Sequence, residues 1–352
     1  MYTRENTKKI KVGSCSIGGG SRIKIQSMTN TKTKDVEKTV AQIQQLEQAG
    51  CDIVRLGVPD MESAKALHVI KKKTSVPLVA DIHFDYRLAL ESIAAGIDKL
   101  RINPGNIGSE DRIEKVVRAA KESRIPIRIG VNGGSLDQEI RRKHQEKITA
   151  EALVESAEKH IRILEAHSFS DIAVSMKASS VPLTIEAYRL FSQRFDYPTH
   201  IGVTEAGTLM KGTVKSSVGL GILLYLGIGD TLRVSLTADP VEEVQVAKSI
   251  LTSLQLYGKP QVEFVSCPTC ARCQIDLIKL AETIEKKVGF VDKNIKIAIM
   301  GCGVNGPGEA KDADIGIAGG DKKALLFKKG EIIGSYPEEE IVDRLLLEIH
   351  KL

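Results

Sequence analysis

Short runs of β-branched and other apolar residues alternate with longer amphipathic stretches up to about residue 255. Runs of this length predict buried strands, and stretches with a 3.6-residue hydrophobic period predict helices. This alternation is typical of βα units around a parallel sheet. The expected strands are residues 22–28, 51–57, 77–84, 98–103, 125–132, 171–177, 200–205 and 230–236.

The number of these repeats narrows the choice of fold. In the stretch 35–50, Val36, Val40, Ile43 and Leu46 share one helical face before Gly50 ends the helix. Eight βα units in roughly 250 residues are what a TIM barrel requires. An open doubly wound sheet with a similar number of elements is the alternative. We predict an α/β fold in which a TIM (β/α)8 barrel occupies residues 1–258.

A smaller α+β region follows the barrel and is expected to form a second domain over residues 259–352. Its predicted elements are a strand at 261–266, a helix at 275–288, a strand at 296–301 and a C-terminal helix at 338–351. This second domain holds four of the six cysteines.

The predicted barrel strands end in polar residues. In a barrel the carboxyl ends of all strands converge on one mouth, so these residues become neighbours. They are Arg55, Asp81, His83, Arg101, Asn103, Arg128, Asn132, Lys177, Glu205, Arg233 and Ser235. Five of them are cations, and like charges in one cavity repel one another unless an anion is bound.

Four of these five cations are arginines, whose planar fork suits phosphate oxygens. The mouth is therefore predicted to bind a ligand with more than one phosphate. His83 and Asn103 are candidates for orienting its hydroxyl groups, and the alternative for His83 is a packing residue, as a lone strand-end histidine more often is. The alternative is that each arginine pairs with a carboxylate at its own strand end. Glu205 is a candidate proton donor or base, because a carboxylate facing such a pocket can exchange a proton with the ligand.

Composition and charge exclude other classes of partner. The net charge is +5, the basic residues are spread along the chain, and seven Tyr, seven Phe and no Trp leave few aromatic rings for base stacking. Nucleic acid is therefore not expected.

The N-terminus lacks the apolar core of a secretory signal, and the longest apolar run, which begins at Val218, is too short to span a bilayer. We predict a cytoplasmic protein without a membrane segment, in which this run forms a buried helix.

Cys267, Cys270, Cys273 and Cys302 lie on two loops that each follow a predicted strand. Disulfides are not expected in the reducing cytoplasm, so clustered thiols indicate a metal centre. A zinc site would use all four cysteines, a redox pair would use the first two, and inert thiols would use none.

An iron–sulfur cluster accounts for more of this pattern. If three cysteines bind, one iron is left for an oxygen ligand or for a substrate. Glu309, in the same loop as Cys302, is the expected oxygen donor, and Asn305 is also expected to reach the site.

Six motifs occur together in this chain. In the predicted barrel they are "RINPGN", "RIGVN", "VSMKAS" and "GVTEAG", and in the second domain they are "SCPTC" and "MGCGVNGPGEA". The sequence resembles the 4-hydroxy-3-methylbut-2-enyl diphosphate synthases of the methylerythritol phosphate route to isoprenoids, from "IQSMTNT" to "GSYPEEE". The resemblance implies a TIM barrel followed by a 4Fe-4S cluster domain. It also implies a reductive opening and dehydroxylation of a cyclic diphosphate, with flavodoxin or ferredoxin as the electron donor.

Position by position, the resemblance implies a role for each candidate residue. The cluster ligands are Cys267, Cys270, Cys302 and Glu309, and Glu205 is the acid and base. The implied substrate-binding residues are Arg55, His83, Arg101, Asn103, Arg128, Lys177, Arg233, Ser235 and Asn305.

Two further expectations accompany this resemblance. Cys273 lies where relatives commonly lack cysteine, so an all-cysteine cluster with Glu309 free is the alternative. The family also implies a head-to-tail homodimer, in which each cluster covers the barrel of the partner subunit.

Overall fold

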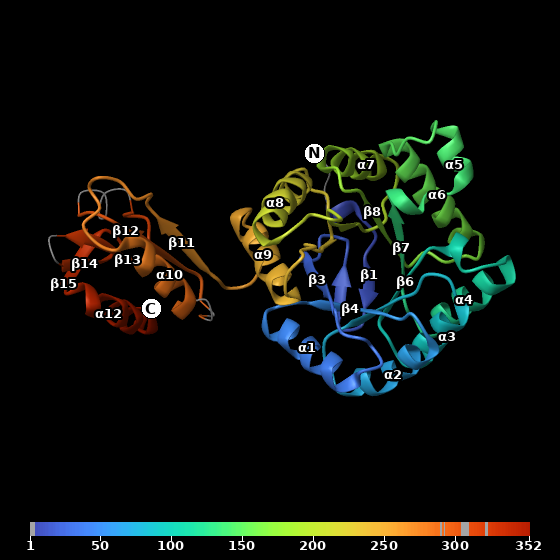
Figure 1. The fold of residues 1–352 in the computed structure, drawn as a ribbon, viewed down its shortest axis with the longest axis horizontal. Helices are drawn as coiled ribbons and strands as arrows, with labels where there is room; N and C mark the ends of the chain where they lie inside the picture. Colours follow the sequence, from blue (N-terminus) through green and yellow to red (C-terminus); the bar gives the residue numbers. More distant parts are fainter. Residues whose placement is uncertain (1–3, 289–290, 292, 304–309, 321–322) are drawn as a thin grey trace. The chain divides into compact units, whose positions relative to one another are not determined.

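A computed structural model describes residues 4–288, 291, 293–303, 310–320 and 323–352. The chain forms two compact units, one up to Tyr257 and one from Gly258 onward (Figure 1).

Eight parallel strands form a barrel in the first unit, in the order β8, β7, β6, β5, β4, β3, β10, β9 (Figure 1). A parallel bridge between Val174 and Thr199 joins β8 to the residue before β9 and closes the ring. The barrel is therefore confirmed over the open doubly wound sheet. The strands are β3 (Lys24–Met28), β4 (Ile53–Gly57), β5 (Leu78–Asp81), β6 (Lys99–Ile102), β7 (Ile127–Asn132), β8 (Ile172–Lys177), β9 (His200–Ile201) and β10 (Thr231–Leu232).

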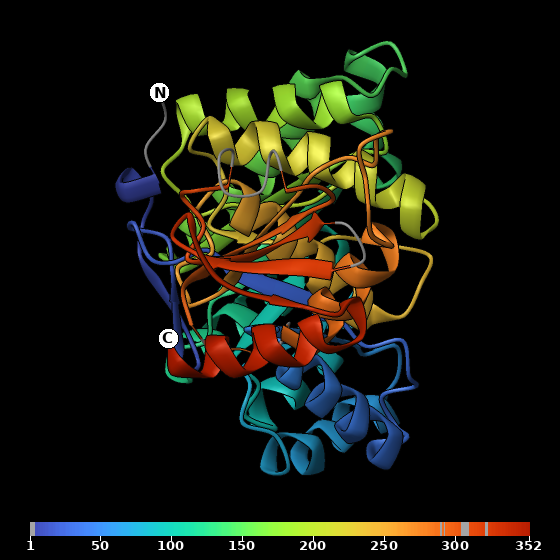
Figure 2. The same ribbon diagram turned by 90° about the vertical axis from the view of Figure 1, so that its left-hand side faces the viewer.

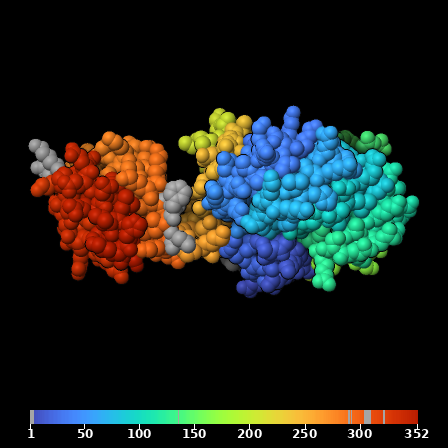
Figure 3. Space-filling model, turned by 90° about the horizontal axis from the view of Figure 1, so that it is seen from below, coloured from blue at the N-terminus to red at the C-terminus, as the bar shows by residue number. Residues whose placement is uncertain are grey.

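Helices surround this ring, and their side chains form a continuous outer surface in the blue to cyan part of Figure 3. Most begin at an aspartate, serine or threonine whose side chain caps the first turn, as Asp60 does for the Ser63 amide at 2.7 Å. The helices are α1 (Val36–Gln48), α2 (Met61–Lys72), α3 (Tyr86–Ala94), α4 (Glu110–Glu122), α5 (Gln138–Lys143), α6 (Ala150–Ala166), α7 (Val181–Arg194), α8 (Leu209–Tyr225) and α9 (Pro240–Ser253).

The two faces of each barrel strand differ in chemistry. Outward residues such as Val54, Leu100 and Ile129 pack with the helices in one large apolar core. The residues between them lie on the inner face, because side chains alternate along a strand. Many of these inner residues are polar, so the barrel interior is not a uniform hydrophobic core.

A short hairpin closes the N-terminal end of the barrel. Its strands are β1 (Ile10–Val12) and β2 (Cys15–Ile17). Ile10, Val12 and Ile17 pack against the inner-face residues Ile53, Val79 and Ala173. This hairpin was not predicted from the sequence, because its strands have only three residues each.

The second unit is a five-stranded mixed sheet with the helices α10 (Leu277–Val288) and α12 (Glu338–Lys351). Its strands are β11 (Val262–Ser266), β12 (Ile295–Met300), β13 (Ile315–Gly320), β14 (Lys323–Lys328) and β15 (Glu331–Tyr336). Figure 2 shows α12, in red, lying along the sheet. The first two strands and both helices were predicted, whereas β13, β14 and β15 were not.

The apolar run from Val218 corrects one prediction. It does form a helix, as part of α8, but Val218, Ile222 and Tyr225 are exposed. The helix buries only the face that carries Leu220, Leu223 and Leu224. None of the helices in the described residues is both long enough and apolar enough to cross a bilayer.

Candidate active site at the barrel mouth

The strand register brings the predicted cations together. Asp81 lies beside Arg101, Arg101 lies beside Arg128, and Asn132 lies beside Lys177. These side chains share the inner face of β5 to β8. The charges that the sequence places on separate strands therefore meet inside one barrel.

Asp81 joins two of the arginines. Its Oδ2 accepts a hydrogen bond from Arg55 Nη2 at 2.5 Å, and its Oδ1 lies 3.4 Å from Arg101 Nη1. Burial disfavours the Asp81 carboxylate, but Arg55 and Arg101 outweigh burial and lower the pKa of the carboxyl group. Arg101 also donates to the Gly130 carbonyl at 3.1 Å, which fixes its guanidinium.

Arg233 is held by a carboxylate that the sequence analysis missed. Its Nε and Nη2 each lie 3.2 Å from an oxygen of Glu243, which α9 contributes. Ser27 Oγ and the Leu236 amide also donate to Glu243, at 2.8 and 3.1 Å. The alternative that each arginine pairs with a carboxylate at its own strand end is wrong in that form, because Arg55 and Arg101 share Asp81 of β5, and Arg233 pairs with Glu243 of α9.

Arg128 and Lys177 differ from these three arginines, because neither forms an ion pair with any described residue. Arg128 is 1% exposed, and its Nε and Nη1 have no hydrogen-bond partner there. Burial, followed by neighbouring cations, lowers the pKa of both groups well below their ordinary values. Buried donors without acceptors are costly, so this part of the barrel favours an anionic ligand.

The remaining mouth residues are placed as follows. Asn103 is buried, and its Oδ1 accepts from the Gly130 amide at 3.0 Å, which ties the ends of β6 and β7 together. His83 is exposed in the loop after β5, and Ser235 is half-buried after β10. Glu205 is exposed after β9 and has a positive φ of 53°, which is uncommon for a residue with a side chain. Such strain is often found at functional sites.

Three further polar residues on the inner face were missed. Lys99, Gln26 and His200 are buried and have side-chain atoms without a hydrogen-bond partner among the described residues. The signal for Lys99 was present, because Lys99 and Arg101 alternate with Leu100 and Ile102. Polar residues at every second position of a buried strand mark the inner face. Glu243 had no such signal, since it lies on a helix.

The cysteine loops follow two adjacent parallel strands. Register pairs Ser266 at the end of β11 with Ile299 of β12, so Cys267 and Cys302 leave the same edge of the sheet. Cys267 Sγ accepts a hydrogen bond from the Gly301 amide at 3.1 Å, and Cys302 is buried. Cys270 is exposed, and contacts with Arg272 lower the pKa of its thiol.

Cys273 has a different environment. Its thiol donates to the Ile275 carbonyl at 3.3 Å, and a Cβ at Gly301 would lie 2.7 Å from Cys273 Sγ. The side chains of the described residues do not form a group of three or more metal ligands. Glu309 and Asn305, which complete the predicted site, lie outside the described residues.

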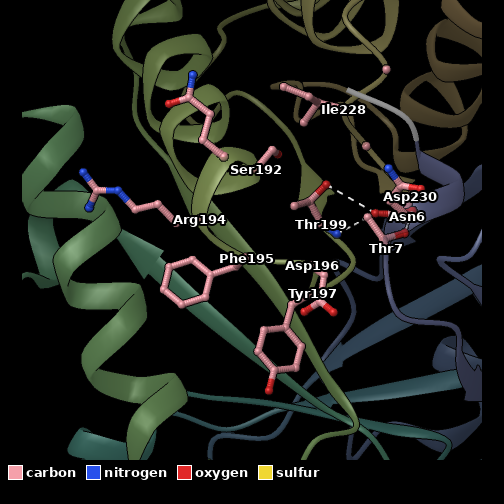
Figure 4. A pocket seen from close by; sticks show the side chains of 13 residues that line it. Asn6, Thr7, Ser192, Arg194, Phe195, Asp196, Tyr197, Thr199, Ile228 and Asp230 are labelled. Carbon is pink, nitrogen blue, oxygen red and sulfur yellow. Dashed lines mark hydrogen bonds between the residues drawn. The ribbon is translucent and has the colours of Figure 1, made fainter. Parts of the chain in front are cut away.

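A cavity of about 420 Å³, whose lining includes Thr7, Thr199 and Asp230 (Figure 4), lies at the opposite end of the barrel from the mouth. It is lined by the segments that precede β9 and β10. Asp230 is buried beside it and accepts from the Thr199 amide at 2.7 Å and from Thr7 Oγ1 at 2.9 Å. These hydrogen bonds tie the N-terminal segment to the strand ends and stabilise the barrel, since the N-terminal face of such barrels is usually structural.

Comparison with known proteins covers both units. Residues 7–248 match the GcpE TIM-barrel domain, and residues 263–351 match the GcpE protein C-terminal domain. The chain belongs to the GcpE family. A relative from Caldanaerobacter subterraneus is 59% identical over 99% of this chain and 98% of its own length. Another from Ruminiclostridium cellulolyticum is 60% identical with the same coverage. Both relatives are named 4-hydroxy-3-methylbut-2-en-1-yl diphosphate synthase (flavodoxin).

Solved structures resemble the GcpE barrel in fold alone. A 3-dehydroquinate dehydratase from Geobacillus kaustophilus has a TM-score of 0.50 and 15% identity over 72% of this chain and 99% of its own. A dihydropteroate synthase from Xanthomonas albilineans has the same TM-score and identity over 70% of this chain and 98% of its own.

Proposed function

We infer that the chain converts 2-C-methyl-D-erythritol 2,4-cyclodiphosphate to 4-hydroxy-3-methylbut-2-enyl diphosphate in isoprenoid biosynthesis. The observation that carries this inference is family membership along both units, with relatives near 60% identity that are named for this product. The reaction opens the ring, removes one hydroxyl group as water and consumes two electrons. The cationic mouth supports a doubly phosphorylated substrate.

The residues of the mouth are proposed to have different roles in substrate binding. Arg128 and Lys177 lack carboxylate partners among the described side chains, so they are free to bind the diphosphate. Arg55, Arg101 and Arg233 are fixed by Asp81 and Glu243 and form a rigid frame around it. Asn103, His83 and Ser235 follow the same strands and are proposed to bind the remaining polar groups of the substrate.

Glu205 is proposed to protonate the departing hydroxyl group. Its carboxylate belongs to the loop after β9, at the same end of the barrel as the cations.

Cys267, Cys270 and Cys302 are proposed to hold a 4Fe-4S cluster, with Glu309 as the fourth ligand. The position of two of these residues supports this assignment, because Cys267 and Cys302 follow adjacent parallel strands at one edge of the sheet. When bound, the cluster supplies electrons to the substrate one at a time. We propose Asn305 as a substrate contact from the same loop.

The electron donor is proposed to be flavodoxin, with ferredoxin as the alternative. The names of the relatives at 54 to 60% identity include flavodoxin.

The function is tested with protein purified without oxygen. We expect about four iron and four sulfide per chain, and turnover of the cyclic diphosphate with reduced flavodoxin. A colourless protein that holds only zinc would contradict the inference. So would a protein with a full cluster that leaves the substrate unchanged.

A homodimer is the proposed assembly, and α8 is its proposed contact surface. Met210, Val214, Val218, Ile222 and Tyr225 are exposed by 42 to 76% and follow one another at intervals of three or four residues. They form one stripe along the helix. The occupant is proposed to be α8 of a second copy, because a stripe this long without a charge at its centre suits a self-complementary contact.

Mixing two inactive variants tests the head-to-tail arrangement. Arg128→Met removes an anion-binding group from the barrel, and Cys302→Ser removes a cluster ligand. If each cluster serves the partner's barrel, exchange of folded subunits restores about a quarter of wild-type activity. The reason is that half of the dimers are then mixed, and each mixed dimer has one intact site out of two. Mixed dimers without activity would contradict the arrangement.

The proposed contact surface on α8 is tested separately. Val218→Lys should yield monomers in light scattering, whereas the exposed Val69→Lys on α2 should not.

A further inference from the structure

Lys99 stands out among the buried charges that the proposed reaction does not use. It is 0% exposed, and its Nζ has no hydrogen-bond partner among the described residues. A buried ammonium group without a partner is costly, and folded proteins rarely retain one. Its presence therefore calls for an explanation.

The register fixes the depth of Lys99 in the barrel. It lies beside Val79, two residues before Arg101 on β6, and Arg101 lies beside Arg128 on β7. Val79 belongs to the apolar floor that the β1–β2 hairpin completes. The backbone of Lys99 thus lies at the level of the barrel floor, one layer of side chains below Arg101 and Arg128.

Charge compensation separates the interior cations into two groups. Arg55, Arg101 and Arg233 form ion pairs with Asp81 or Glu243. The other group has no ion pair in the described part of the chain and consists of Lys99, Arg128 and Lys177. These three come from β6, β7 and β8, which are neighbours in the sheet. The uncompensated positive charge is therefore concentrated on one side of the barrel.

We propose that Lys99 completes the anion site as a buried cation that acts with Arg128 and Lys177 on a phosphate-bearing ligand. This proposal rests on the proposed function and adds a residue to its binding site. Lys99 acts through its charge, which is effective over several ångströms because the interior screens charge far less than water does. It is a positioning residue, with no role as an acid or base.

Protonation of Lys99 supports the proposal. Burial and then Arg128 lower the pKa of its amine well below the ordinary value, Arg55 adds to this effect, and Cys15 of the hairpin opposes it. A bound anion favours the ammonium form and raises the pKa. Anion binding therefore takes up a proton, so affinity should fall as pH rises above the pKa of the free protein.

The test compares Lys99→Met with wild type in full-length protein purified without oxygen, with inorganic pyrophosphate as the probe. Met keeps the length of the side chain and removes its charge. We expect pyrophosphate to bind roughly tenfold to a hundredfold more weakly. We also expect the anion-free variant to melt at a higher temperature, by roughly 2–4 °C, because Met has no amine that must lose its hydration or its proton when the chain folds.

The opposite signs of these two changes distinguish an electrostatic role from a structural one. A purely structural Lys99 would lower the melting temperature and the affinity together, and that result would overturn the proposal. The pH dependence of binding should also be flatter in the variant. Lys65→Met, on the exposed face of α2, is the matched control and should bind pyrophosphate as wild type does.

Two outcomes separate this proposal from the proposed function. If wild type turns over the cyclic diphosphate but Lys99→Met binds pyrophosphate equally well, only the role of Lys99 is overturned. If wild type neither binds pyrophosphate nor turns over the cyclic diphosphate, both are overturned.

Discussion

Cys302→Ser is expected to remove the cluster and abolish turnover. Cys302 is buried at the end of β12, beside the strand that leads into Cys267, so another side chain cannot easily take its place. A serine hydroxyl is a poor substitute for a thiolate ligand. The measurement is iron and sulfide content per chain, with visible absorption and turnover under anaerobic conditions. We expect activity to fall by at least about a thousandfold, since the reaction needs two electrons.

Cys273→Ser is the matched control for this prediction. Because the Cys273 thiol donates to the Ile275 carbonyl, a serine hydroxyl can keep that hydrogen bond. The variant should retain the cluster and most of its activity. Loss of the cluster in Cys273→Ser would return the chain to an all-cysteine site and leave Glu309 without a role as a ligand.

Arg128→Lys has the second largest expected effect. The variant keeps the positive charge but loses the planar fork, whose Nε and Nη1 have no partner among the described residues. A lysine cannot form two parallel hydrogen bonds to one phosphate group. We expect KM for the cyclic diphosphate to rise by roughly tenfold to a hundredfold, with a smaller change in kcat.

The control for Arg128→Lys is the same substitution at Arg118, which is exposed on α4. It should leave both kinetic constants unchanged. If Arg128→Lys also has normal kinetics, the uncompensated guanidinium does not bind the substrate, and the anion site lies elsewhere in the barrel.

The barrel was predictable because its signal is repeated. Eight apolar runs with helices between them define the fold, even though β9 and β10 are only two residues long. Those two strands form mainly through their neighbours, so a local pattern overestimates their length. The β1–β2 hairpin and β13 to β15 had no comparable signal, because short strands and a glycine-rich segment depend on tertiary contacts.

The candidate site was predictable to the extent that strand ends reveal it. Arg55, Arg101, Arg128, Lys177 and Arg233 do come together inside the barrel, because parallel strands share one direction. Their division into compensated and uncompensated charges was not predictable. For Arg233 it depends on Glu243, which approaches from α9 and meets this arginine through the fold alone.

The β1–β2 hairpin has a consequence for kinetics. Because Ile10, Val12 and Ile17 seal the floor of the barrel, the described residues leave the mouth as the route for both substrate and product. The diphosphate product must leave by the path that the next substrate takes. Product inhibition should therefore be competitive with the cyclic diphosphate, because both molecules reach the same site from the mouth.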